Sequence, residues 1–175
     1  MSGFVLFATP WWVNLLILAP AVPFLLSRKA KLGIGRKRLL VTAIFGAAFG
    51  FVEAAVVVYL RADAGLWPSP QERTVSAFPA SLLTVECVRE AATMIMLGVI
   101  AWIAAQRLRE KAVAFLWTFA LWDFTYYVWL RVSIGWPTSL INPDLLFLIP
   151  VPWVAQVWFP LLVSGLTAMA IWLRS

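Results

Sequence analysis

Long apolar runs separated by short polar stretches dominate the pattern of this chain. The runs cover residues 4–26, 39–60, 81–105, 112–130 and 152–173. Each is close to the roughly 20 residues that a helix needs to cross a hydrocarbon core about 30 Å thick. In lipid the backbone must satisfy its own hydrogen bonds, which favours helices. The pattern predicts an all-α polytopic membrane protein, a five-transmembrane-helix bundle that forms a single transmembrane domain over residues 1–175.

Prolines indicate where the predicted helices bend or stop. Pro10, Pro20 and Pro23 fall in the first run, so we expect a short or kinked first helix. Three further prolines between residues 68 and 79 predict a loop between the second and third runs. The segment 135–152 is apolar in its middle but too short to cross the membrane, so we expect an outer re-entrant or interfacial segment packed on the bundle.

Composition agrees with a lipid environment. The chain is 63% hydrophobic and only 13% charged, whereas soluble domains are about 45–50% apolar. Its eleven tryptophans are typical of membrane interfaces. The chain has no histidine and a single cysteine. Haem ligation by imidazole, an ordinary zinc site and a Ser-His-Asp triad are therefore not expected.

The chain has a net charge of +6, and the distribution of its charged residues indicates membrane topology rather than a nucleic-acid-binding surface. One side of the predicted bundle carries ten basic residues. The opposite side carries only three, Arg61, Arg73 and Arg131, and three acidic residues, Asp63, Glu72 and Asp144, balance them. By the positive-inside rule the more basic side is cytoplasmic. We therefore expect a bacterial inner (plasma) membrane protein with its N-terminus outside and its C-terminus in the cytoplasm. The basic side is defined by ten residues: Arg28, Lys29, Lys31, Arg36, Lys37, Arg38, Arg107, Arg109, Lys111 and Arg174.

Ionisable side chains inside the predicted spans are the strongest functional signal. Each would cost several kcal/mol facing lipid, so these side chains must face the bundle interior, a water-filled cavity or a partner subunit. With a rise of 1.5 Å per residue, they fall roughly 8–14 Å below the outer end of three separate helices. They are Glu53, Glu86, Arg89, Glu90 and Asp123.

Spacing predicts that these side chains share one site. Glu86 and Glu90 are four residues apart and so lie on one helix face, with Arg89 beside them. Tyr126 and Tyr127 follow Asp123 by three and four residues, so at least one phenol can approach the same site. The predicted ligand-binding residues are Glu53, Glu86, Arg89, Glu90, Asp123, Tyr126 and Tyr127.

Four carboxylates and one guanidinium leave a formal charge of −3 in a low-dielectric region, which protons, a cation or inward-folding arginines must compensate. One interpretation is a buried ion-pair network in which Glu86, Glu53 or Asp123 share Arg89. Another is a hard cation such as calcium, magnesium or manganese, because the available ligands are oxygens. The candidate metal ligands are Glu53, Glu86, Glu90 and Asp123.

Three functions fit these observations. The first is a site, open to the external face, for a cation, protons or a small polar ligand. The second is a structural or accessory subunit of a larger membrane complex, or a homo-oligomer, whose internal charges meet a partner helix. The third is an enzyme acting on a lipid-linked substrate at the outer leaflet. In the outer loop, Asn142 and Asp144 favour a turn over direct ligands.

Several stretches together resemble a group of uncharacterised bacterial polytopic inner-membrane proteins. The resemblance would span most of the chain from the second helix onward, and it implies no activity, cofactor or substrate. The stretches are Val57-Val58-Tyr59-Leu60-Arg61, Val85-Glu86-Cys87-Val88-Arg89-Glu90-Ala91, Trp122-Asp123-Phe124-Thr125-Tyr126-Tyr127, Gly135-Trp136-Pro137 and Phe147-Leu148-Ile149-Pro150-Val151-Pro152-Trp153.

Overall fold

The computed structural model describes residues 7–28, 31–63 and 80–175. Lys29, Glu72 and Arg73, the side chain of Asp63, the predicted loop 64–79 and the start of the first predicted span lie outside the described part. The elements, in chain order, are β1 (Ala8–Thr9), the 3₁₀-helix η1 (Trp11–Ala21), α1 (Val22–Leu26), α2 (Arg36–Asp63), α3 (Ala80–Ala104), α4 (Leu108–Ile134), β2 (Pro143–Phe147), β3 (Trp153–Gln156) and α5 (Trp158–Arg174).

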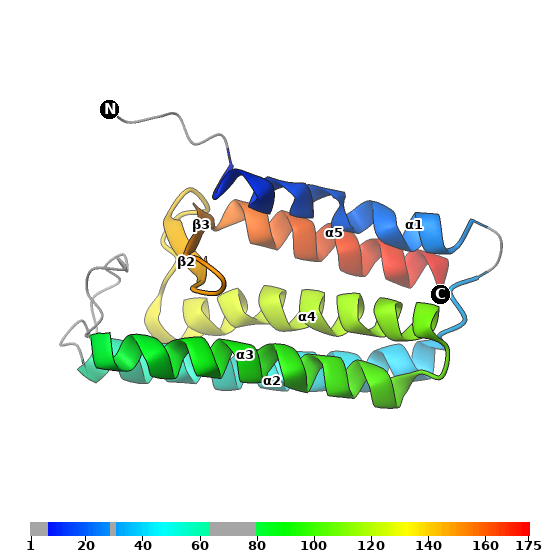
Figure 1. Cartoon of the computed structure of the whole chain (residues 1–175), viewed down its shortest axis with the longest axis horizontal. Coiled ribbons are helices and arrows are strands. Elements are labelled where there is room, and N and C mark those ends of the chain that lie inside the picture. The colour runs from blue at the N-terminus through cyan, green and yellow to red at the C-terminus, as the bar shows by residue number, and fades with distance from the viewer. Residues whose placement is uncertain (1–6, 29–30, 64–79) are drawn as a thin grey trace.

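The helices form an elongated bundle with α4 at its centre. Helix α4 packs against α2, α3 and α5, and η1 packs on α5. Figure 1 shows α2 and α3 along one side of α4, with α5 and the η1–α1 segment along the other. The strands lie at one end of the bundle, and the C-terminus lies at the other. The bundle therefore has two distinct ends, one capped by the strands and one that holds the C-terminus.

Three of the helices are long and apolar enough to cross a membrane. They cover Arg36–Ala62, Leu82–Ala104 and Leu108–Ile134. The apolar helical segments Trp11–Leu26 and Trp158–Arg174 are shorter than these. Large apolar side chains are exposed on the outer faces, as at Ile44 (71%) and Ile95 (66%). Such an exterior is what a hydrocarbon environment requires, and it agrees with a membrane location.

The first predicted helix is broken as its prolines predict. Residues Trp11–Ala21 form a 3₁₀-helix that contains Pro20, and the α-helical turn Val22–Leu26 has Pro23 near its start. Proline lacks the backbone N–H of a continuous α-helix and fixes its own φ angle, so it is tolerated in a first turn but disrupts a helix interior. The expected short or kinked helix is confirmed.

Two small residues let α2 and α4 approach closely. A Cβ added at Gly46 would lie 3.0 Å from the carbonyl oxygen of Thr118, and one added at Gly50 would lie 2.8 Å from that of Trp122. The backbone of α4 occupies the space that side chains would need, as expected for a small-xxx-small pair. Nearby, Trp129 Nε1 donates to the carbonyl oxygen of Ala47 at 3.0 Å. Gly46 and Gly50 thus fix α2 against the central helix.

The segment expected to be re-entrant or interfacial contributes two strands to a three-stranded antiparallel sheet. The strand order is β1-β3-β2, with Asp144 opposite Ala155 and Ala8 also opposite Ala155 on the other side of β3. The fold is therefore mostly helical rather than strictly all-α. Strand pairing satisfies backbone groups of a segment too short to span. The sheet covers the end of the bundle where the predicted site lies.

Candidate functional site

All seven predicted ligand-binding residues line one cavity between α2, α3, α4 and strand β2. The cavity has a volume of about 50 Å³. Because a water molecule needs about 10–15 Å³ of such volume, the cavity has room for roughly three to five waters. The residues that line it are Glu53, Val57, Glu86, Arg89, Glu90, Thr93, Trp122, Asp123, Tyr126, Tyr127, Asp144 and Leu145 to Leu148.

Arg89 links two helices through two carboxylates. Its Nε and Nη2 atoms donate to the two oxygens of Glu86, at 2.9 and 2.7 Å, in the side-by-side geometry that suits a guanidinium. Its Nη1 atom contacts Oε2 of Glu53 on α2. The other oxygen of Glu53 accepts a hydrogen bond from Thr93 Oγ1 at 2.6 Å. The expected ion-pair network therefore exists, with Glu86 and Glu53, and not Asp123, sharing Arg89.

Glu90 lies one helical turn from Glu86 but binds a different part of the molecule. The backbone N–H of Leu148 donates to both carboxylate oxygens, at 3.0 and 2.8 Å, and the N–H of Ile149 donates to Oε2 at 3.3 Å. Only 5% of Glu90 is exposed. This carboxylate therefore attaches α3 to the turn between β2 and β3, which covers the cavity.

The remaining acidic groups are held by hydroxyls from α4 and α5. Ser164 Oγ donates to Asp123 at 2.6 Å, which joins α5 to α4. The phenol of Tyr127 donates to Asp144 Oδ2 at 2.8 Å. The rings of Tyr126 and Tyr127 contact each other edge to face, with centroids 5.1 Å apart. Both tyrosines predicted to accompany Asp123 therefore lie at the cavity.

Asp144 is the site residue that sequence reasoning favoured least. The Asn-Pro-Asp sequence indicated a turn, but the structure places Asp144 on β2, buried to 6% exposure. Asp144 pairs with Ala155 of β3, and its carboxylate accepts the hydrogen bond from Tyr127 of α4. No local signal revealed this, because the position of Asp144 depends on the strand pairing.

Three further cavity or bridging residues were missed. Thr93 lies one turn after Arg89, so the i, i+4 spacing could have revealed it. Trp122 precedes Asp123, and its Nε1 is buried without a hydrogen-bond partner among the described residues. Ser164 lies on α5, to which no predicted site residue belongs. Trp122 thus lines the cavity and carries a buried donor that no described protein group satisfies.

The cavity has more negative than positive groups. Five carboxylates line it, against the single guanidinium of Arg89. Arg61 is buried at 2% exposure, and its guanidinium lies 5.1 Å from the ring of Trp136, which contacts the ring of the cavity residue Tyr127. Counting Arg61 as well still leaves a formal surplus of three negative charges among the described residues. Burial makes such a surplus unfavourable unless protons or a bound cation compensate it.

The expected metal-ligand set of Glu53, Glu86, Glu90 and Asp123 is not assembled. In the described part of the chain, no three acidic or cysteine side chains are grouped so that they could hold a metal ion. The physical reason is that the four carboxylates are directed to different partners: Arg89 and Thr93, the backbone of Leu148 and Ile149, and Ser164. The carboxylates share a cavity wall without converging on one point.

Comparison with protein-family models, with curated proteins and with solved structures finds no match for this chain. Its function must therefore be argued from the cavity and the bundle themselves.

Proposed function

We propose that this chain is a five-span integral membrane protein of the bacterial inner membrane. The three long helices are joined by η1–α1 and α5, which run alongside them (Figure 1). A 3₁₀-helix rises about 2.0 Å per residue, so Trp11–Ala21 with α1 reaches about 30 Å, which matches the hydrocarbon core. Helix α5, with 17 residues, reaches about 25 Å and is continued outward by β3.

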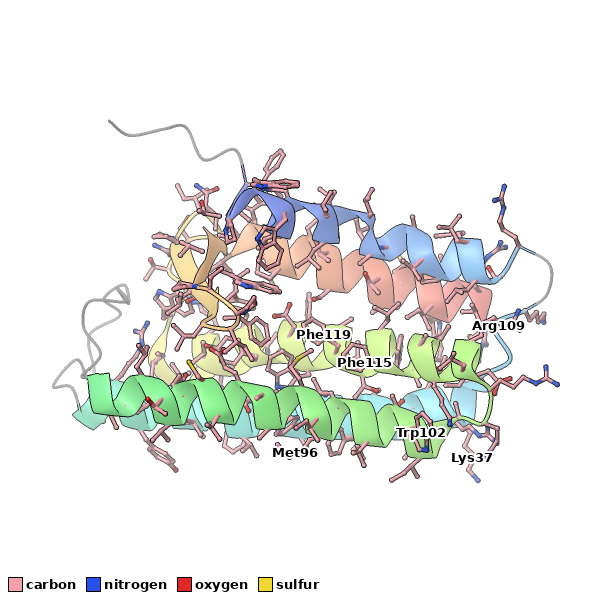
Figure 2. All side chains as sticks on the ribbon, viewed as in Figure 1. Lys37, Met96, Trp102, Arg109, Phe115 and Phe119 are labelled. Carbon is pink, nitrogen blue, oxygen red and sulfur yellow. The ribbon has the colours of Figure 1, made fainter. Side chains whose placement is uncertain are left out.

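The proposed orientation places the N-terminus outside and the C-terminus in the cytoplasm. Its support is the clustering of basic segments at one end of the bundle. Arg109 Nη1 and Nη2 donate to the carbonyl oxygens of Leu26 and Lys31, at 3.3 and 3.0 Å. Arg174 Nε donates to Ser27 Oγ at 2.9 Å. Figure 2 shows Lys37 and Arg109 at this same end. The positive-inside rule makes this end cytoplasmic, so the cavity lies in the outer half.

The function we propose is binding of a small positively charged ligand, either a cation or protons, in the outer cavity. The observation that carries the proposal is the surplus of carboxylates over guanidinium groups around a space large enough for a few waters. A polar space with this excess of acceptor oxygens attracts positive charge. Tyr126, Tyr127 and Trp122 add aromatic faces, which also favour a cation.

The accessory-subunit alternative receives less support. That interpretation requires charged side chains on a lipid-facing surface that a partner helix would cover. The described acidic side chains of α2 and α3 are buried instead, with Glu53, Glu86 and Glu90 exposed by 5–7%. Their partners belong to this chain. The charges are thus explained without another subunit.

The test uses the full chain in lipid nanodiscs at constant ionic strength. Thermal unfolding is followed in sodium, potassium, ammonium, methylammonium and guanidinium chloride, and again across pH 5 to 9. A bound cation raises Tm with its concentration because it binds the folded state. If protons occupy the cavity instead, the folded state holds protons that the unfolded state has lost, so stability falls as pH rises.

The matched variants are Asp123→Asn and Glu110→Gln. Glu110 is also buried, at 8% exposure, but lies in the first turn of α4 at the opposite end of the bundle. We expect Asp123→Asn to weaken the cation or pH response at least fivefold and Glu110→Gln to preserve it. Equal responses in both variants, or no response in the unaltered chain, would contradict the proposal.

A further inference from the structure

An apolar groove lies next to the acidic cavity. Its volume is about 510 Å³, within the range of about 300–1,000 Å³ typical of ligand pockets. It is formed by η1 and α5 on one side and by α4 and α3 on the other, with the β2–β3 turn at one end. Figure 2 shows two of its residues, Phe115 and Phe119, in the space between the α5 and α3 ribbons.

The groove offers almost nothing to a polar ligand. Its two hydroxyl groups are already donated elsewhere, Ser164 to Asp123 and Thr167 to the carbonyl oxygen of Val163 at 2.7 Å. The remaining side chains of the lining are aliphatic, aromatic or the thioether of Met94, and their one polar atom is the buried Nε1 of Trp153. A hydrocarbon chain is the ligand chemistry that such walls accept without a desolvation cost.

The groove and the cavity meet at two residues. Phe147 lines both, and its ring contacts those of Phe119, Trp122 and Trp153, with centroids 6.5, 6.2 and 5.3 Å apart. Ser164 lines the groove and donates to Asp123, which lines the cavity. The apolar groove and the negatively charged cavity therefore adjoin at Phe147 and at the hydrogen-bonded pair of Ser164 and Asp123.

We propose that the two spaces together bind a long-chain amphiphile with a small protonated amine at its head. The hydrocarbon chain lies in the groove and the ammonium group enters the cavity beside Phe147. This inference rests on the proposed function, because it requires the cavity to bind positive charge, and it names the class of ligand.

Charge and size select this occupant over an ordinary neighbouring lipid. The surplus of carboxylates around the cavity favours an ammonium group over a neutral or anionic head. The cavity holds only about three to five waters, so a primary amine fits better than a bulky headgroup. From the β2–β3 turn the groove extends along α4 to Phe115, about 12 Å below Asp123 along the helix axis. A chain entering from the outer leaflet takes this direction.

The experiment uses the full chain in phosphatidylcholine nanodiscs and two photoreactive probes. One is a sixteen-carbon primary amine with a diazirine in its chain, and the other is the alcohol with the same chain and diazirine. We expect the amine to label peptides that contain Phe115, Phe119 or Val163, at concentrations at least tenfold lower than the alcohol. Asp123→Asn should bring the two probes to within about twofold of each other.

Groove variants test where the chain binds. Ala19 lines the groove and is half-buried, so Ala19→Phe should fill the groove and reduce amine labelling at least fivefold. Val163→Phe fills the same space from α5 and serves if the first variant does not give a monodisperse helical protein. Met169→Phe is the control, because Met169 lies on the exterior of α5 with 53% exposure.

The outcomes separate this inference from the function on which it rests. If amine and alcohol label the unaltered chain equally, or if both groove variants label fully, the inference is overturned. If methylammonium still raises Tm in an Asp123-dependent manner in that case, the cation-binding proposal stands alone. If methylammonium and the other cations have no effect, pH does not alter stability, and the probes do not differ, both proposals fail.

Discussion

The carboxylate of Glu90 receives the backbone N–H of Leu148 on both of its oxygens, at 3.0 and 2.8 Å. These two residues are 58 positions apart in the chain, on α3 and directly after β2. The contact makes Glu90 the direct connection between the helical bundle and the turn that covers the cavity. A buried carboxylate thus has a structural role alongside the charge that it contributes.

Replacing Glu90 should loosen the β2–β3 turn. Glu90→Ala removes a charge-assisted acceptor from the buried N–H of Leu148 and the part-buried N–H of Ile149, with an expected cost of about 1.5–3 kcal/mol. Hydrogen exchange at the Leu148 and Ile149 amides should accelerate at least tenfold. Glu90→Gln retains one acceptor oxygen and should show a smaller increase. Unchanged exchange at these amides in Glu90→Ala would contradict this role, whereas Glu110→Gln should leave them protected.

Removing the guanidinium of Arg89 should destabilise the bundle strongly. Arg89→Gln leaves Glu53 and Glu86 buried without their cationic partner, which typically costs about 3–5 kcal/mol. The free energy of unfolding in mixed micelles measures this loss. The triple variant Glu53→Gln, Glu86→Gln and Arg89→Leu removes all three charges and should recover most of the stability. A triple variant as unstable as Arg89→Gln would show that charge burial is not the cause.

Much of this site could be predicted from helical spacing. Apolar runs, loop charges and a fixed rise per residue predict that Glu53, Glu86 and Asp123, on three separate helices, lie at one depth. These signals can be read from each helix separately, without knowing how the helices pack. Proline is likewise a local signal, and Pro20 and Pro23 predict the broken first helix.

The remaining features depend on contacts distant in sequence. The segment that contains Asp144 lacks the alternating pattern of a half-buried strand, so its pairing with β3 was not predicted. Spacing alone predicts that Glu86 and Glu90 lie on one helix face. It does not predict that Glu86 binds Arg89 while Glu90 binds the turn between β2 and β3. The candidate metal ligands are not grouped in the described part of the chain, because side chains that share a depth need not converge on one point.

The contact between α2 and α4 should be sensitive to a single methyl group. A Cβ at Gly50 would lie 2.5 Å from Thr125 Oγ1 and 2.8 Å from the carbonyl oxygen of Trp122. The hydroxyl can rotate, but the backbone carbonyl cannot yield without separating the helices. Gly50→Ala should therefore cost about 1–3 kcal/mol of unfolding free energy.

Gly98 provides the matched control for this prediction. It lies within α3, and a Cβ there would meet no atom within 4 Å. Gly98→Ala should be neutral or stabilising by up to about 1 kcal/mol, because alanine has the higher helix propensity. If both variants lose stability equally, close helix approach at Gly50 is not the reason.

The proposed topology predicts which side of the membrane each end of the bundle faces. Ser139 is exposed at the sheet end of the bundle and Gln106 at the basic end. In a Cys87→Ser background, Ser139→Cys should react with a membrane-impermeant maleimide added to intact spheroplasts. Gln106→Cys should react only after permeabilisation, because the positive-inside rule places its loop in the cytoplasm. The reverse pattern would put the acidic cavity on the cytoplasmic side and move the expected source of its ligand there. Labelling of both sites from outside would contradict the assignment of these two ends to opposite faces of the membrane.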